Sequence, residues 1–240
     1  MHAFPGGTAV TSLTVYDGAS LDGLAGGTPH LHTASTEGYI VVGGSGAIQT
    51  IEPSGFRETP LQPGVVVWFT PGTVHRAINH GGLYVICVMQ NSGLPEAGDA
   101  VMSFADEIVS DAERYREAAT LPSGTGQDTA TAARIRRDLG VQGFLELRAA
   151  IESGDSEPLE RFYAHAARLV QPRIAAWRET WERGAHAATI NTDTVLNALA
   201  AADSSTLRSA ALFEAEPNEG DERFGMCGRL RTYDVTPRQR

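Results

Sequence analysis

Two sequence patterns divide the chain, and the change between them limits the folds that it can adopt. Residues 8–92 consist of short segments rich in Val, Ile, Thr and aromatic residues, each bounded by Gly or Pro. Regularly spaced segments of this kind are typical of a β-sandwich or barrel. Residues 99–215 are dominated by Ala, Glu, Arg and Leu, which favour helices. The sequence therefore predicts a β barrel over 8–92, an α-helical region over 99–215 and one returning strand over 224–235.

The helical region divides at proline and glycine residues. Pro172 lacks the N–H that a helix interior needs, so it should break the helix near Gln171, and Gly184 can end the next piece. The predicted helices are Asp99–Ala119, Thr129–Leu139, Val141–Glu152, Pro158–Val170, Pro172–Arg183, Thr192–Ala202 and Thr206–Phe213. Apolar residues in Pro158–Val170 recur at helical spacing, so this face should pack on the barrel or on a second subunit of a homo-oligomer.

Charge and composition exclude several classes of partner. The formal net charge is -10, and every positively charged side chain is Arg because the sequence contains no Lys. An acidic chain lacks the basic surface of a nucleic-acid binder and is repelled by anionic membranes. The absence of Lys also excludes a Schiff-base lysine. Residues 1–7 lack a charged and apolar leader, and no apolar run is long enough to span a bilayer, so we expect a cytoplasmic protein.

Four residues of the β-rich half have the spacing of a metal site. His30 and His32 are two residues apart, so on a strand their side chains point to the same face. Glu37 follows after a gap long enough to change strand, and His75 would arrive from a distant strand. Three imidazoles and one carboxylate suit one divalent transition metal, which could be Fe, Mn, Ni, Co, Zn or Cu.

These residues lie in two motifs that resemble those of the cupin superfamily. The first is His30-x-His32, four residues, Glu37, six residues, Gly44; the second is Gly64, Gly72-x-x-His75, three residues, Asn79. The chain departs from the family pattern at Thr70, where Pro is expected, and at Leu24, where Gly is expected. Both departures affect turns and leave the four metal-binding positions intact. The resemblance covers residues 8–92 and implies a double-stranded β-helix, or jelly-roll, barrel with the metal inside it.

Strand alternation extends the predicted site. If Glu37 points inward, Tyr39 and Val41 also do, while Ile40 and Val42 face outward. Tyr39 is the candidate catalytic residue, as a hydrogen-bond donor to substrate or bound water; a filled barrel interior is the alternative. The run Arg134-x-Arg136-Arg137 is expected to form a solvated helix face and, less often, a grip for an acidic substrate.

The predicted site favours an enzyme that acts on a small organic molecule. One possibility is an Fe(II)-type dioxygenase. Another is an isomerase or epimerase of sugars or hydroxy-carbonyl compounds, in which the metal acts as a Lewis acid. The isomerase requires a base. Glu37 is already assigned as a metal ligand, and Glu52 and Glu58 lie near loops. The lack of an obvious base favours the dioxygenase slightly. A non-catalytic module that binds a small ligand is the third alternative.

Overall fold

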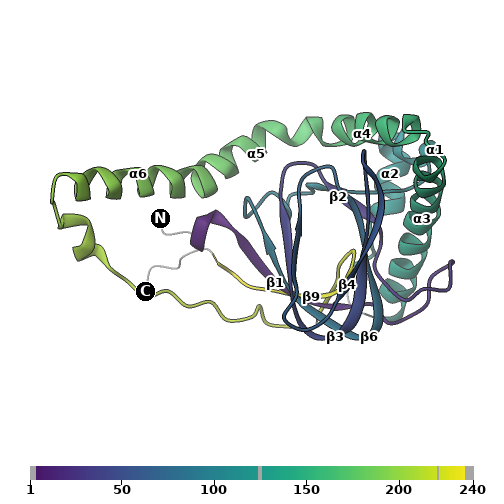
Figure 1. Ribbon diagram of the computed structural model, residues 1–240, viewed down its shortest axis with the longest axis horizontal. Coiled ribbons are helices and arrows are strands. Elements are labelled where there is room, and N and C mark those ends of the chain that lie inside the picture. Colours follow the sequence, from purple (N-terminus) through teal and green to yellow (C-terminus); the bar gives the residue numbers. More distant parts are fainter. Residues whose placement is uncertain (1–3, 124–125, 221, 236–240) are drawn as a thin grey trace.

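An antiparallel sheet that closes into a jelly-roll barrel forms the centre of the computed structural model, which describes residues 4–123, 126–220 and 222–235. Helices cover one side of the barrel and continue beyond it (Figure 1). The predicted fold class, a β-rich jelly-roll barrel followed by an α-helical region, is confirmed. Within the described ranges, no helix has the length and apolar character needed to cross a bilayer.

The described residues form a sheet of nine strands, whose main path is β4-β3-β6-β1-β9-β8. Strand β5 pairs with β3, and the short strand β2 lies between β6 and β7. The strands are β1 (Ala9–Val15), β2 (His30–His32), β3 (Glu37–Glu52), β4 (Gly55–Leu61), β5 (Val66–Phe69), β6 (Val74–Met89), β7 (Ala100–Met102), β8 (Arg223–Phe224) and β9 (Gly228–Thr232).

Two strands are longer than the sequence pattern suggests. Glycine-rich segments at 43–46 and 80–82 were expected to separate strands, yet β3 and β6 run through them and pair with each other along their length. The pairing register shifts between Val41 and Gly46, so the two strands bend together there. Gly44 has a φ of 71° and lies against the backbone of Gly82, where a side chain would collide. The glycines therefore bend the sheet into a barrel without ending its strands.

The helices differ from the predicted set at several boundaries. They are α1 (Asp106–Val109), α2 (Ala112–Ala119), α3 (Gln127–Glu152), α4 (Glu157–Val170), α5 (Ile174–Trp181) and α6 (Ala187–Ala200), with short turns η1 (Pro5–Gly7), η2 (Gln171–Arg173), η3 (Glu182–His186) and η4 (Ser205–Ser209). Pro172 interrupts the helix in η2, as predicted. Gly184 does not end it, because η3 carries the chain directly into α6. The helix predicted over Thr206–Phe213 is only the short turn η4.

The prediction of a helix over Asp99–Ala119 is also wrong in its first part, because the first helix there begins at Asp106. Residues 100–102 form β7, which pairs with β2 in the register His30 to Met102 and His32 to Ala100. This pairing lies next to the predicted ligands and cannot be read from local helix propensity. The two helices predicted over 129–152 are one helix, α3, in which Gly140 allows close contact: a Cβ there would lie 2.8 Å from Thr28 Cγ2.

The helical region packs on the barrel through an apolar core. Phe162 and Val170 of the predicted apolar face are buried in α4, and they belong to a cluster that includes Leu31 and Ile51 of the barrel and Phe144 of α3. A second apolar cluster fills the barrel interior. The predicted packing of this helix against the barrel is therefore confirmed.

Two arginines of α3 are structural, which corrects the prediction of a solvated face. Arg134 is exposed, but Arg136 and Arg137 are buried. Arg137 donates from Nη1 to Gly18 O and from Nη2 to Ala19 O, both at 2.7 Å. Arg136 donates from Nη2 to Gly225 O at 2.6 Å. These side chains bind backbone carbonyls of two loops and join them to α3.

The C-terminal segment returns to the barrel as a hairpin. Strand β9 pairs with β1 from Thr11–Thr232 to Val15–Gly228, and β8 pairs with β9, where one returning strand was predicted. The turn between them reaches the barrel interior: Thr28 N donates to Met226 O at 2.8 Å, and Gly27 packs against the Cys227 backbone. Residues distant in sequence thus close one side of the barrel.

Replacing Arg137 by Met should lower the free energy of unfolding by about 2 kcal/mol, because the hydrogen bonds of the buried guanidinium to Gly18 O and Ala19 O are lost. Chemical denaturation followed by circular dichroism measures this change. Replacing the exposed Arg134 by Met is the matched control and should change stability by less than about 0.5 kcal/mol. Equal effects of the two substitutions would contradict a structural role for the buried guanidinium.

Candidate metal centre

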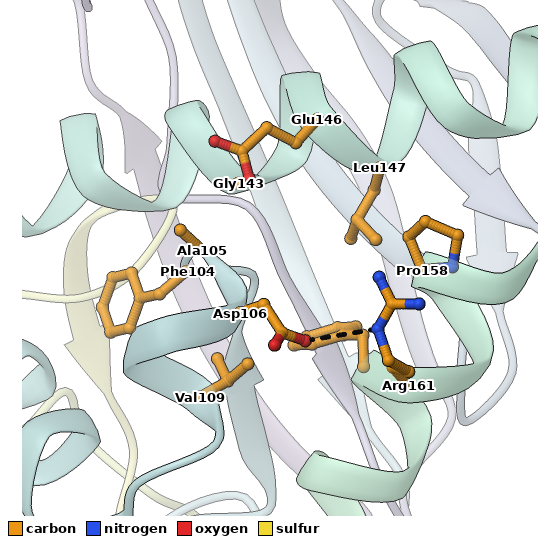
Figure 2. A pocket seen from close by; sticks show the side chains of 10 residues that line it. Phe104, Ala105, Asp106, Val109, Gly143, Glu146, Leu147, Pro158 and Arg161 are labelled. Carbon is orange, nitrogen blue, oxygen red and sulfur yellow. Dashed lines mark ion pairs between the residues drawn. The ribbon is translucent and has the colours of Figure 1, made fainter.

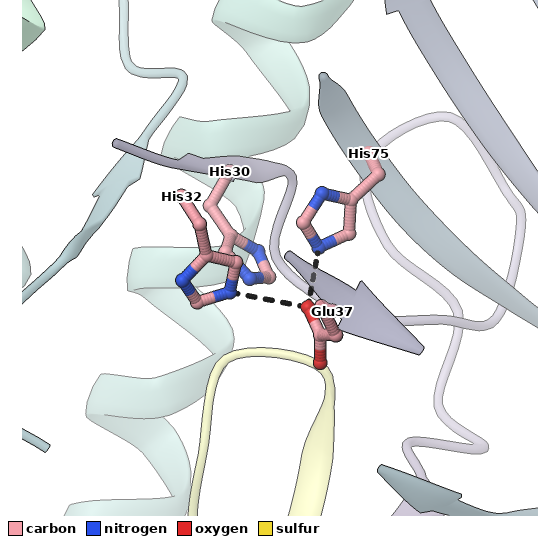
Figure 3. A group of neighbouring side chains, drawn as sticks. All are labelled: His30, His32, Glu37 and His75. Carbon is pink, nitrogen blue, oxygen red and sulfur yellow. Dashed lines mark ion pairs between the residues drawn. The ribbon is translucent and has the colours of Figure 1, made fainter. Parts of the chain in front are cut away.

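The four predicted ligands converge at one place inside the barrel. His30 and His32 lie on β2, Glu37 is the first residue of β3, and His75 is near the start of β6. His30 and His75 are direct partners in the β2–β6 pairing. One ligand atom from each of the four side chains lies within 4.8 Å of the other three (Figure 3), and all four residues are buried. The structure therefore brings together the residues that spacing alone singled out.

Backbone carbonyls fix the orientation of two of the imidazoles. His30 Nδ1 lies 2.9 Å from Thr28 O, and His75 Nδ1 lies 3.0 Å from Thr73 O. A carbonyl oxygen only accepts hydrogen bonds, so in both rings Nδ1 carries the proton and donates it. In the neutral form of each ring, Nε2 then carries the free lone pair. Each ring is set by the carbonyl two residues before it, a device that holds a neutral imidazole ready to bind a metal.

Buried polar atoms without hydrogen-bond partners lie close together at the centre of the cluster. His75 Nε2 lies 3.2 Å from Glu37 Oε2, and neither of these buried atoms has a hydrogen-bond partner. His32 Nε2 lies 3.1 Å from the same carboxylate oxygen. Buried polar atoms without hydrogen-bond partners cost free energy, and a bound cation would satisfy them. Three imidazole nitrogens and one carboxylate oxygen fit a divalent transition metal.

Asp99 is a component of the site that the sequence analysis missed. Its Oδ2 lies 3.4 Å from His32 Nδ1, on the side of the ring opposite Glu37. Its Oδ1 accepts hydrogen bonds from Thr33 N, Thr33 Oγ1 and Ala34 N at 2.7–2.8 Å, so the carboxylate is held in place. A carboxylate behind a ligating imidazole orients the ring and raises its basicity. Asp99 precedes β7, and only the pairing of β7 with β2 brings it here.

The protonation states of the cluster follow from burial and charge. Burial and the neighbouring imidazoles of His75 and His32 hold the pKa of His30 well below its usual range. Burial acts in the same direction on His32, but the carboxylates of Asp99 and Glu37 outweigh it and raise the pKa of His32 to about 9. Burial alone would raise the pKa of Glu37, but the imidazoles of His32 and His75 beside it lower it instead. Glu37 is therefore anionic, as a ligand must be.

Other side chains of the barrel interior remain protonated. Burial raises the pKa of Tyr39 and of Cys87 well above their usual ranges, and it raises the pKa of Cys227 to about 12. Tyr39 Oη donates a hydrogen bond to Cys227 Sγ at 3.4 Å, and its ring packs edge-on against Phe69. Sequence alternation placed Tyr39 inside the barrel; its contact with Cys227 depends on the C-terminal hairpin.

The predicted strand faces agree with the structure. Tyr39 and Val41 are buried, whereas Ile40 and Val42 are exposed on the outer surface. Arg76 follows the predicted ligand His75, so strand alternation directs it to the outer face, yet it is buried because the loop before β2 covers it. Its Nη1 forms an ion pair with Asp22 Oδ2 at 2.6 Å. The outward position of Arg76 therefore serves the attachment of that loop.

A separate cavity of about 170 Å³ lies between α1, α3 and α4, outside the barrel (Figure 2). Phe104, Leu147 and Phe162 contribute apolar walls. Asp106 Oδ1 and Arg161 Nε approach to 3.6 Å at its edge. None of the four predicted ligands lines this cavity, so it is distinct from the histidine–glutamate cluster.

Comparison with known proteins identifies the family of the barrel. Residues 21–89 match the family model of the cupin domain, and they include all four predicted ligands. This part of the chain is therefore a cupin domain, as the two motifs indicated. No match was found among curated proteins.

Solved structures with similar barrels come from several bacteria. A protein of Klebsiella pneumoniae with a double-stranded β-helix domain is 19% identical; the match covers 35% of this chain and 66% of that one, with a TM-score of 0.29. A predicted oxalate decarboxylase of Thermotoga maritima is 20% identical over 35% and 64%, with a TM-score of 0.26. A TDP-fucose-3,4-ketoisomerase of Campylobacter jejuni is 11% identical over 33% and 58%, with a TM-score of 0.29. The match spans less than two thirds of each of these proteins.

In the metal-free protein, His32 should titrate with a pKa of about 9, and replacing Asp99 by Asn should lower it by about one unit. The cause is the loss of one of the two carboxylates that stabilise the imidazolium. Two-dimensional NMR of the histidine rings measures the titration. Asp106→Asn removes a carboxylate that faces His165 instead and should leave the His32 titration unchanged. An unaltered His32 pKa in Asp99→Asn would rule out their coupling.

Proposed function

We propose that the cupin domain is a metal-dependent enzyme that acts on a small organic molecule, with His30, His32, Glu37 and His75 holding one divalent transition metal. The supporting observation is that His75 Nε2 and Glu37 Oε2 are buried 3.2 Å apart without hydrogen-bond partners, within a group of four possible ligands. Such an arrangement is unfavourable without a cation and favourable with one. The bound metal would supply a Lewis acid and, if it is iron, a redox centre.

The neighbouring groups favour an Fe(II)-type dioxygenase over an isomerase. An isomerase needs a base beside the substrate. Among the described residues around the cluster, Asp99 is engaged by His32 and Thr33, and Glu37 serves as a ligand. Tyr39, Cys87 and Cys227 have raised pKa values and stay protonated near neutral pH. Chemistry driven by a redox metal does not require such a base, so this environment suits oxidation better than proton abstraction.

The same surroundings favour an uncharged substrate. The sequence contains no Lys. Arg76 lies next to His75 on β6, but its guanidinium forms an ion pair with Asp22. Phe69 lies directly against the His75 ring, with the ring centroids 4.0 Å apart. A phosphorylated sugar needs cationic donors for its phosphate. An aromatic ring and two thiols beside the cluster suit a small apolar or aromatic molecule that binds the metal through its own oxygen atoms.

Tyr39 is proposed to donate a hydrogen bond to this substrate. Its hydroxyl bonds to the thiol of Cys227 at 3.4 Å, and sulfur is a weak acceptor. A substrate oxygen would be a stronger acceptor, so the donor could change partner at low cost. Burial keeps the phenol protonated, because it raises the pKa of Tyr39 well above its usual range.

Replacing His32 by Ala should remove most of the bound metal, because one of four ligands is lost. Metal content after purification and calorimetric titration with Co(II) measure this loss. In the unaltered protein, affinity should rise with pH up to about 9, since the metal must displace the proton of His32. His165→Ala is the matched control, because His165 lies on α4 outside the cluster, and it should retain full metal content. Stoichiometric metal in His32→Ala would disprove the ligand assignment.

Iron-loaded protein should consume O₂ when it is offered a suitable substrate from a panel of catechols, diketones and hydroxy acids. An oxygen electrode measures the rate, and a parallel panel of sugar phosphates tests for isomerisation. Tyr39→Phe should keep the metal and lower turnover about 10-fold or more, because one donor to the reacting molecule is lost. Isomerisation without O₂ uptake would overturn the dioxygenase assignment.

The burial of the cluster favours one alternative, a site that binds metal without catalysis. The side chains of Glu37 and His32 are only 8% and 7% exposed, and that of His75 is fully buried. A substrate must therefore displace part of the wall before it reaches them. If metal removal lowers the melting temperature markedly, and no panel compound binds or reacts, the non-catalytic role replaces the enzymatic one.

A further inference from the structure

The helical arm α6 (Ala187–Ala200) has the composition of a buried helix but lies in solvent. Asp193 is its only ionisable residue, and none of its residues is buried. Ile190, Leu196 and Leu199 are 53%, 59% and 48% exposed. A helix with so few charges and apolar residues around its circumference is normally covered by other protein. Within the part of the chain that the structure describes, the short turns η1, η3 and η4 lie against the arm and leave these apolar side chains exposed.

A second apolar surface lies on the outside of the barrel, which we call the sheet face: Ile40 and Val42 of β3 with Val66 and Trp68 of β5. The four residues lie on paired strands, with Ile40 opposite Val66 and Gly38 opposite Trp68. Trp68 is 70% exposed, and the other three are 41–54% exposed. The sheet face contains no charged side chain. A contiguous apolar patch of this kind on a soluble domain marks an interaction surface.

The arm and the sheet face do not meet within one chain. In the described structure, α6 packs against the short turns η1, η3 and η4. The chain is helical from Ile174 to Ala200, a length on the order of 40 Å, and carries α6 clear of the barrel (Figure 1). Each surface is therefore available to a different molecule.

We infer that the arm of one copy of this chain packs on the sheet face of a second copy, and that a two-fold axis repeats the contact. One arrangement then covers both apolar surfaces and closes without further growth. The exposed side chains of the arm and the sheet face amount to several hundred Å² for each chain, approaching the roughly 800 Å² that each partner buries in a stable dimer. Apart from Asp193, neither surface carries a charged side chain that this contact would bury without a partner. The inference does not depend on the metal or on the proposed reaction.

Light scattering coupled to size-exclusion chromatography of the full chain tests this dimer. The unaltered protein should be dimeric at micromolar concentration. Trp68→Glu on the sheet face and Leu196→Glu on the arm should each raise the dimer dissociation constant by about 100-fold or more, because each loses an apolar anchor and introduces a charge into the contact. Both residues are exposed in the single chain, so circular dichroism should report unchanged folding. Ile135→Glu is the matched control, since Ile135 is 59% exposed on α3 away from both surfaces, and it should stay dimeric.

Mixing the two monomeric variants identifies which surfaces meet. A pair of one Trp68→Glu chain and one Leu196→Glu chain retains one contact in which both the arm and the sheet face are unaltered. The mixture should therefore form a heterodimer, weaker than the unaltered dimer, whereas neither variant dimerises alone. A monomeric unaltered protein would overturn the inference and assign the surfaces to another partner. A dimeric Trp68→Glu variant would overturn the inference in favour of arm-to-arm pairing. A mixture of the two variants that forms no heterodimer would also overturn it.

Discussion

The close approach of His75 Nε2 and Glu37 Oε2, two buried atoms 3.2 Å apart without hydrogen-bond partners, is the constraint on which the arrangement around it depends. It persists because strong surrounding contacts fix both groups. Thr73 O accepts a hydrogen bond from His75 Nδ1 and so fixes the orientation of the imidazole. The pairing of β3 with β6 along most of their length fixes the positions of Glu37 and His75 in the sheet. A cation bound there would satisfy these atoms, so their cost in the metal-free protein would contribute to the binding free energy.

The helical region contributes to the site although the family match ends at residue 89. Strand β7 pairs with β2 and delivers Asp99 behind His32. Ser103 Oγ lies 3.2 Å from both Pro29 O and Gly140 O, so it links the approach to β2 with α3. The barrel of this chain is thus braced by elements that follow it, and its metal cluster would lose orientation without them.

The C-terminal hairpin joins the two regions in a different way. Gly225 O accepts hydrogen bonds from Tyr16 Oη and from Arg136 Nη2, which ties the hairpin to the barrel and to α3 together. Its turn places Cys227 against Tyr39 in the interior. The interior of the barrel is therefore lined in part by a residue near the C-terminal end of the described chain.

The sequence alone determined the barrel, its inward and outward faces and the four converging side chains, because strand alternation and motif spacing are local properties of the chain. It also located the break at Pro172, since a missing N–H acts wherever it occurs. Only the tertiary structure decided the roles of Asp99, Arg136, Arg137 and Cys227, because each acts through a partner far away in sequence. Asp99 lies in a segment with helical composition, yet pairing with β2 makes the next residues a strand. Arg136 and Arg137 look like a solvated run, but the loops that they bind remove them from water. Long-range contacts override local propensity at these positions, because a buried guanidinium or imidazole needs a fixed hydrogen-bond partner once it is removed from water.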